Sequence, residues 1–304
     1  MTHGSGMIRA RLALVVIALA FALASCSDQG DGAMMDEPWD GPVMPPVDPQ
    51  AAAQFREWQE DNALPAIFLA SAGPAPATPQ GSRIGGKVWL PAGEDWPQSR
   101  AGVPMEFVAQ IDFAQLPHIP DFPTSGLLQF FIAPDMMFGA DFNQPENGDF
   151  KVFWREDVDG AGSLRDGGPD GRNGRDYYSP MEDTGAGIAL TGAVEMHLPT
   201  ITAWHLRRDL PELTKGKGRG TMNAAFDAHY GEAPERHHVG GHPEFTQDDW
   251  RIADEYQHVD RVLLNLWSKD GMMWGDAGQG QFLIGREDLL KRDFSKVYYA
   301  FDGA

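Results

Sequence analysis

The stretch "DGMMWGDAGQGQFLIGREDLLKRDFSKV", residues 270–297, shows the pattern on which the whole chain is built. Gly275 and Gly278 mark a turn, and the apolar run "GQFLI" follows it directly. The segment "REDLLKR" predicts a short helix, and "KVYYAF" (296–301) predicts a further strand. Short apolar runs separated by glycines favour a β-rich fold over a helical one.

The same pattern recurs along the chain from Ser82 onward. Residues 49–63 predict an N-terminal helix, with Asp48 as its cap and Pro65 beyond its end. A second short helix is predicted at 221–231, and the Gly- and Asp-rich residues 156–187 predict a long loop. The predicted strands are KVWL (87–90), MEFVAQID (105–112), GLLQFFIA (126–133), FKVFW (150–154), IALTGAVEMHLP (188–199), DRVLLNLWS (260–268), GQGQFLI (278–284) and KVYYAF (296–301).

An internal repeat connects the two ends of this pattern. "RIGGKVWLP", "FVAQIDF" and "GLLQFFI" are followed, in the same order and at similar spacing, by "HVGGHPEF", "LLNLWS" and "GQGQFLI". Such a period indicates a duplicated unit with halves at about 82–155 and 238–301. The predicted fold class is therefore α+β: a β-rich body of mixed or antiparallel sheet, built from two related halves, with an N-terminal helix and short peripheral helices.

These segments together resemble a known family. "IGGKVWLP", "FVAQIDFAQLP", "HHVGGHPEF" and "MMWGDAG", the last followed by an F-x-I strand and "DFS", are similar to the YwqG-like family, a bacterial domain of unknown function (1963). The resemblance covers about residues 50–301. It implies an α+β domain with two related halves and implies no reaction. The chain departs from the family at "LLNLWS", where similar proteins tend to carry a Gln-containing strand, and in its long Gly/Asp insertion.

The first 26 residues have the pattern of a lipoprotein signal peptide. Arg9 and Arg11 precede the apolar run "LALVVIALAFALA", which ends in the lipobox "LASC" at Cys26. An ordinary cleaved signal or an anchor helix is the alternative. Residues 27–48, rich in Pro, Gly and acid, then form a tether, and residues 49–304 form the YwqG-like domain. We expect an envelope protein held on the membrane by its lipid. Ser27 favours the periplasmic side of the outer membrane if the cell is Gram-negative.

Composition excludes several classes of function. Cys26 is the only cysteine, so the fold has no disulfide framework, no paired-cysteine metal site and no spare cysteine nucleophile. Arg9 and Arg11 are the only charged residues of the first 26, and the remainder carries 22 basic against 44 acidic side chains. Such a surface repels phosphates, so no nucleic-acid partner is expected, while a basic protein is a candidate partner.

The turn "MMWGDAGQG" has two interpretations. In the structural one, Gly275 and Gly278 supply backbone freedom, Asp276 accepts hydrogen bonds from turn N–H groups, and Trp274 packs in the core. In the catalytic one, Asp276 is an acid or base tuned by its apolar neighbours. The structural interpretation is favoured, because an Asp between glycines most often serves its own turn.

Polar residues within apolar strands mark a second candidate site. Gln110 and Gln129 lie in the middle of two predicted strands, where a buried amide either connects the strands or lines a cleft. Arg83 and His238 hold equivalent places, each two residues before a Gly-Gly pair. The candidate cleft therefore comprises Arg83, Gln110, Gln129, His238, Trp274 and Asp276.

No cofactor or metal is expected from the sequence. His237, His238 and His242 invite a zinc hypothesis, but the glycines between them exclude a regular helix and no paired cysteine accompanies them. Asp157 and Asp159 begin a loop that lacks the ligands a calcium loop needs.

The leading functional hypothesis is a lipid-anchored binding domain of unknown ligand. The alternative is a hydrolase that uses Asp276 and His238 in a cleft between the two halves.

Overall fold

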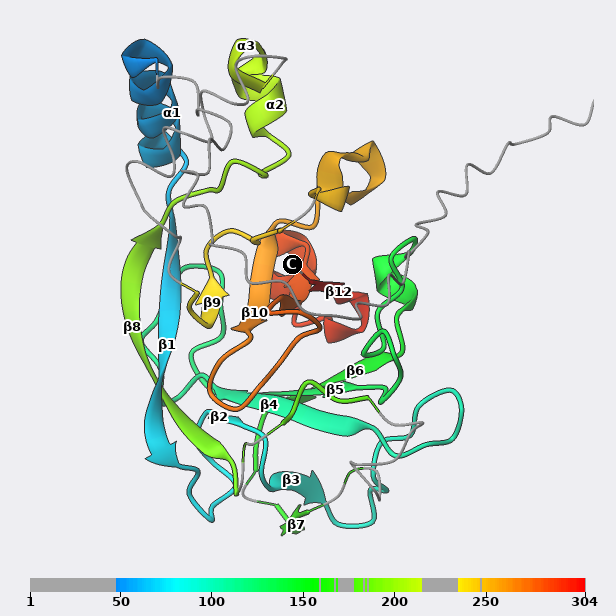
Figure 1. Cartoon of the computed structure of the whole chain (residues 1–304). Helices are drawn as coiled ribbons and strands as arrows, with labels where there is room; N and C mark the ends of the chain where they lie inside the picture. The colour runs from blue at the N-terminus through cyan, green and yellow to red at the C-terminus, as the bar shows by residue number, and fades with distance from the viewer. Residues whose placement is uncertain are drawn as a thin grey trace, which may run out of the picture. The chain divides into compact units, whose positions relative to one another are not determined.

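A computed structural model describes residues 48–158, 160–166, 168, 178–182, 184, 186–214, 235–246 and 248–303 (Figure 1). All of them belong to the compact unit Met44–Ala304. Cys26, the tether and the helix predicted at 221–231 lie outside the described residues.

Among the described residues, ten strands form one antiparallel sheet in the order β12-β11-β10-β9-β1-β8-β2-β4-β5-β6. A small second sheet pairs two further strands, β3 and β7. The strands are β1 (Leu64–Pro74), β2 (Arg83–Ile84), β3 (Val88–Pro91), β4 (Glu106–Asp112), β5 (Leu127–Ile132), β6 (Phe150–Arg155), β7 (Gly162–Arg165), β8 (Ile188–His197), β9 (His238–Gly240), β10 (Arg261–Trp267), β11 (Gln279–Ile284) and β12 (Tyr298–Asp302).

The β-rich antiparallel body confirms the main prediction of fold class. Each predicted strand is present within a few residues of its expected bounds. Four of the described strands were not predicted, and the short β2 and β9 are two of them. β1, at the centre of the sheet, lies where no strand was predicted, and it forms because it hydrogen-bonds to β8 along nearly its whole length. β7 lies inside the predicted loop 156–187 and forms because it pairs with β3.

The N-terminal helix α1 (Pro49–Asp61) begins where the sequence predicts. The Asp48 carboxylate accepts the N–H groups of Gln50 and Ala51, and the helix buries Phe55 and Trp58. No helix among the described residues is long and apolar enough to span a bilayer. The other helices are α2 (Leu206–Asp209), α3 (Pro211–Thr214) and α5 (Arg286–Lys291), with 3-10 turns η1 (Pro145–Asn147), η2 (Trp250–Ile252), η3 (Asp254–Tyr256) and η4 (Phe294–Lys296).

The sheet curls until its two edges meet across the core. The Phe150 ring at the start of β6 lies 5.4 Å from Tyr299 on β12, and Phe130 on β5 lies 4.7 Å from Phe282 on β11. The strand runs β2-β4-β5-β6 and β9-β10-β11-β12 thus share one hydrophobic core. In Figure 1 the paired strands β1 and β8 form a long ribbon that connects the two runs.

Candidate functional site

Arg83, Gln110 and Gln129 form one row across β2, β4 and β5. Arg83 pairs with Gln110 and Gln110 with Gln129 in the strand register, and all three side chains are buried. Gln129 Nε2 donates to Gln110 Oε1 at 3.1 Å and to Trp89 O at 2.8 Å. On its other side, Arg155 Nε donates to Gln129 Oε1 at 3.0 Å.

Arg83, at the end of this row, hydrogen-bonds to backbone carbonyl groups on both sides of β2. Its guanidinium donates to the carbonyl oxygens of Pro76, Thr78, Gln80 and Lys87. Burial lowers the pKa of Arg83, with Asp112 acting in the opposite direction. Arg83, Gln110 and Gln129 thus lie together, and the hydrogen bonds of Arg83 hold the loop before β2 against the sheet.

His238 belongs to a second polar row, across β9, β10 and β11. It pairs with Asn265, which pairs with Gln281. His238 Nδ1 donates to Gly240 O at 2.9 Å, so Nε2 carries the lone pair that accepts from Asn265 Nδ2 at 2.9 Å. The ring is fully buried, and this burial lowers the pKa of His238 to about 3, with nearby His197 acting in the same direction. The imidazole is therefore neutral.

Glu244 lies at the centre of this second row. Oε1 accepts from His197 Nε2 at 3.1 Å, while Oε2 accepts from Trp267 Nε1 at 2.8 Å and from Asn265 Nδ2 at 3.3 Å. Burial is the largest influence on the pKa of Glu244 and raises it, but the hydrogen bonds from His197 and Trp267 and the nearby His238 and His197 rings together outweigh burial, and the pKa lies below its ordinary value. Glu244 is thus an ionised carboxylate that is nine-tenths buried.

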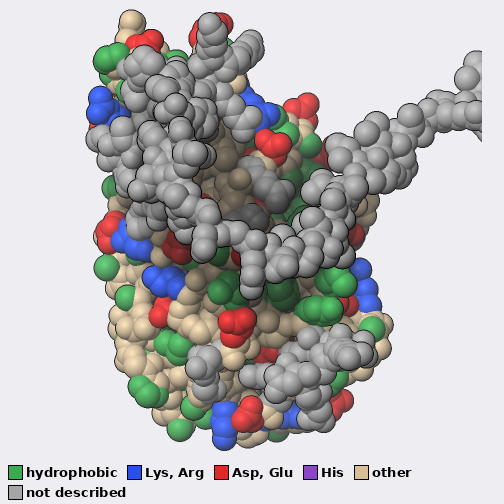
Figure 2. All heavy atoms as spheres, viewed as in Figure 1, with side chains coloured by type: hydrophobic (Ala, Val, Ile, Leu, Met, Phe, Trp, Pro, Cys, Tyr) green, Lys and Arg blue, Asp and Glu red, His purple; other side chains and the backbone are tan. Residues whose placement is uncertain are grey.

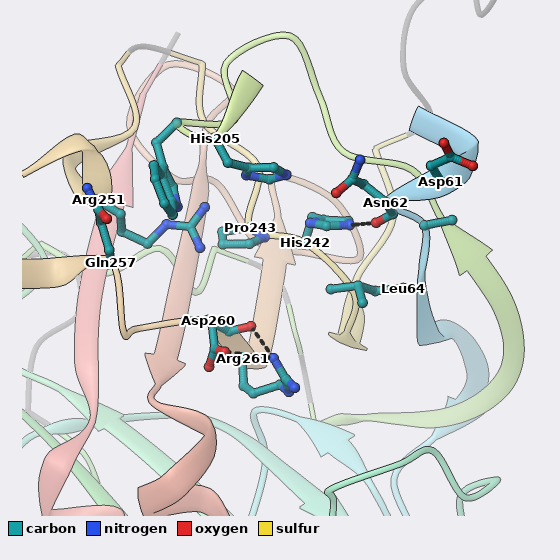
Figure 3. Close-up of a pocket in the computed structure, with 12 residues that line it drawn as sticks. Asp61, Asn62, Leu64, His205, His242, Pro243, Arg251, Gln257, Asp260 and Arg261 are labelled. Carbon is teal, nitrogen blue, oxygen red and sulfur yellow. Dashed lines mark hydrogen bonds and ion pairs between the residues drawn. The ribbon is translucent and has the colours of Figure 1, made fainter. Parts of the chain in front are cut away.

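Four imidazole rings connect this buried group with a surface cavity. Ring centroids are 4.7 Å apart from His238 to His197, 6.0 Å from His197 to His242 and 5.9 Å from His242 to His205. His242 and His205 line a cavity of about 300 Å³. Figure 3 shows them side by side, with His242 Nε2 donating to Asn62 O at 2.8 Å. We call these four rings the histidine chain.

The two arginines in the walls of this cavity are already paired. The Arg251 guanidinium donates to both carboxylate oxygens of Asp249, at 2.9 and 2.7 Å, and to Val259 O. Arg261 contacts Asp260 at 3.1 Å, as Figure 3 shows. The histidines, whose pKa values are lowered chiefly by burial, are therefore its distinctive groups.

A second cavity, of about 290 Å³, has a different lining. Four aromatic rings and three carboxylates surround it, and its lining among the described residues includes no Lys or Arg. These residues are Phe142, Phe245, Trp250 and Phe301, with Asp141, Asp248 and Asp302. One of the carboxylates, Asp248, forms an exposed ion pair with Arg207 at 3.0 Å. We call this the aromatic–acidic cavity.

The structure separates Trp274 and Asp276 from the polar rows. Trp274 is fully buried in the core, as expected, whereas the Asp276 side chain is exposed. Among the described residues no hydrogen bond reaches its carboxylate, which corrects the expected role of Asp276. Ser268 holds the turn instead: its Oγ accepts from Trp274 N and donates to Gly278 O, both at 2.8 Å.

The histidines of "ERHHVGGH" face three different partners. His237 Nδ1 accepts from Trp267 N, His238 faces Asn265, and His242 faces Asn62. They do not converge on one point. Asp159 of the weak calcium pattern lies outside the described residues.

Sequence reasoning missed Asn265 and Gln281 of the second row, and also His197 and Glu244, which contact it. Asn265 was detectable, because it interrupts the apolar run "LLNLW" just as Gln129 interrupts "LLQFF". His197 and Glu244 gave no signal, because the contact between them depends on how β1 joins β8 to β9.

Comparison with curated proteins finds no match to the chain. Comparison with protein families does find one, over residues 82–303, which leaves α1 and β1 ahead of the matched segment. The matching family is described as a domain of unknown function, DUF1963, and since the match covers most of the chain, the chain belongs to this family.

Proposed function

We propose that the chain is a lipid-anchored envelope protein whose domain binds a cationic side chain of a basic partner protein. The observation that carries the binding proposal is the lining of the aromatic–acidic cavity. Aromatic faces attract ammonium and guanidinium groups, and carboxylates at the same opening supply the opposite charge. A lining with four aromatic rings, three carboxylates and, among the described residues, no Lys or Arg suits an ammonium or guanidinium group.

The charge of the whole molecule supports the same partner. The chain carries 44 acidic and 24 basic side chains, so its long-range field attracts cations. On the face shown in Figure 2, Lys and Arg side chains are scattered singly among Asp and Glu and form no basic patch. A basic protein would therefore be attracted before its side chain enters the cavity.

The cavity is tested with a matched pair of peptides. One peptide carries a single arginine, and the other carries the uncharged isostere citrulline at that position. We expect quenching or a shift of tryptophan fluorescence with the arginine peptide alone, and weaker binding as salt is raised. Equal binding of both peptides contradicts the proposal.

Variants locate the binding. Phe142→Ala and Asp248→Asn alter exposed residues of the cavity, so neither should unfold the chain. Asp276→Asn is the matched control, since it removes one exposed carboxylate outside the cavity. Each cavity variant should weaken arginine-peptide binding about 3- to 10-fold, while the control should leave it unchanged. If the control weakens binding as much as Asp248→Asn, the attraction is nonspecific.

Lipid anchoring rests on the lipobox "LASC" and the single cysteine. Cys26→Ser should abolish incorporation of labelled palmitate, and the larger, uncleaved precursor should accumulate. Normal processing of this variant would contradict the anchor.

The hydrolase alternative receives no support from the geometry. His238 is fully buried, Asp276 is exposed, and no contact joins them among the described residues.

We also infer that the two runs of strands descend from one duplicated unit. Supporting this, Arg83, Gln110 and Gln129 hold the same register positions as His238, Asn265 and Gln281. Both Gly-Gly pairs after the first strand of each run also have positive φ, between 58° and 75°.

A further inference from the structure

His197, His238 and Glu244 present three metal-binding atoms to one buried point. These atoms lie within 4.8 Å of one another. His197 Nε2 is 3.1 Å from Glu244 Oε1, and His238 Nε2 is 3.9 Å from Glu244 Oε2. Ligands at about 2.1 Å from a tetrahedral ion are separated by roughly 3.4 Å, so small side-chain movements bring all three to bonding distance.

The surroundings of His238 are those of a metal-binding histidine. Its Nδ1–H donates to Gly240 O, which orients the ring and leaves the Nε2 lone pair directed at Asn265 and Glu244. A backbone carbonyl that holds the second ring nitrogen is the usual outer partner of a metal-bound histidine. Because Nε2 accepts a hydrogen bond from Asn265 Nδ2, this nitrogen carries no proton, as metal binding requires.

Without a cation, two buried polar groups of this site lack a suitable partner. Glu244 is buried, its carboxylate oxygens accept hydrogen bonds from His197, Asn265 and Trp267, and no Lys or Arg of the described chain lies within ion-pair distance of it. The side-chain oxygen of Asn265 is buried and has no hydrogen-bond partner within that same part of the chain. A buried charge without a counter-ion, beside an unpaired oxygen, indicates that a cation belongs there.

We propose that His197, His238 and Glu244 bind one divalent transition-metal ion. Two imidazoles and one carboxylate suit zinc and its neighbours in the first transition row better than Mg²⁺ or Ca²⁺, which prefer ligands that are all oxygen. The cavity lined by His205 and His242 is the opening next to the histidine chain, since the His242 ring also contacts His197. This site is independent of the aromatic–acidic cavity.

Metal binding is coupled to a local change at His197. In this structure His197 Nδ1 accepts a hydrogen bond from His242 N at 3.2 Å. The ring proton is therefore on Nε2, which donates a hydrogen bond to Glu244 Oε1. A metal on Nε2 replaces that proton, and a neutral ring then carries its proton on Nδ1, opposite the His242 N–H. The peptide between Gly241 and His242 has to move. Because the His242 ring lines the cavity, metal binding alters the cavity wall.

The test uses the full chain, purified without a histidine tag and stripped with a chelator. Titration with ZnCl₂ in a calorimeter should show one ion per chain. Titration with CoCl₂ should give the visible absorption bands of a low-symmetry site with nitrogen and oxygen ligands. His238→Gln and Glu244→Gln should each weaken Zn²⁺ binding on the order of 100-fold. His118→Gln removes an exposed histidine and should leave binding unchanged.

Two outcomes overturn the proposal. One is the absence of saturable Zn²⁺ binding in the parent chain, and the other is parental affinity in folded Glu244→Gln. The variant His205→Gln separates the buried site from the cavity: loss of the ion in this variant, with binding retained in His238→Gln, places the ion in the cavity and also contradicts the proposal.

If His238→Gln fails to fold by circular dichroism, X-ray absorption of the zinc-loaded parent decides the question. Two imidazoles and no sulfur around the zinc support the site, and fewer than two imidazoles overturn it.

Discussion

Replacing Ser268 with alanine tests what holds the turn between β10 and β11. Ser268 Oγ accepts from Trp274 N and donates to Gly278 O, both at 2.8 Å, across a turn that a Gly278 N–H bond to Trp274 O also closes. Alanine removes both side-chain bonds in a partly buried place. At about 1 kcal/mol for each bond, Ser268→Ala should lower the free energy of unfolding by about 2 kcal/mol.

The matched perturbation is Asp276→Ala in the same turn. Its carboxylate is exposed and accepts no hydrogen bond from the described residues, so the free energy of unfolding should change by less than about 0.5 kcal/mol. For a domain of this size the Ser268 variant should melt roughly 4 to 8 °C below the parent. Thermal melts of the parent and both variants give the answer. If Asp276→Ala lowered the melting temperature as much as Ser268→Ala, our reasoning would be refuted, and Asp276 would be the residue that stabilises the turn.

Three further predictions concern stability. Arg83→Met should lower the free energy of unfolding by roughly 3 kcal/mol or more in urea titrations, because several buried carbonyls lose their donor, and a loss below 1 kcal/mol would contradict this role. Gly280→Ala places a Cβ 2.5 Å from the Trp274 ring and should cost about 1–3 kcal/mol; Gly160→Ala, with nothing within 4 Å, is the control. The hydrogen bond from Arg286, with the Arg261 pair, lowers the pKa of Asp121 below 3.8. The stabilisation by Asp121 is therefore present above that pH and is lost as the pH falls through the lowered pKa. Asp121→Asn should be less stable than the parent at pH 7, with a smaller difference at pH 3 in urea titrations; a constant difference would be evidence against the linkage.

The strand pattern was predictable wherever an apolar run is bounded by glycine or proline. "GLLQFFIA" and "GQGQFLI" identify β5 and β11 because their apolar density exceeds that of the flanking turns. β1 escaped prediction because its outer half, residues 70–74, consists of small residues and a proline and is exposed. Its strand conformation depends on hydrogen bonds from β8, more than a hundred residues later in the chain, and local propensity does not report such bonds.

The candidate sites also differ in how far the sequence could predict them. Arg83, Gln110 and Gln129 could be placed together, because adjacent strands with a polar residue at matching positions bring those residues into one row. Glu244 could not be placed, since it follows β9 in an irregular segment and meets His197 only after β1 has aligned β8 and β9. For Asp276 the sequence located the turn correctly but misidentified the group that holds it.

The central position of β1 also decides the order in which the chain can fold. Leu64 pairs with His197, and the inner part of β1 pairs with Val239 and its neighbours, so among the described residues every strand partner of β1 lies at residue 188 or later. Closing loops of this length before any pairing energy is gained gives the fold a high contact order and slow folding. A polypeptide shortened from its C-terminus to that point has an unpaired strand where the middle of the sheet belongs, and aggregation rather than partial function is the expected result.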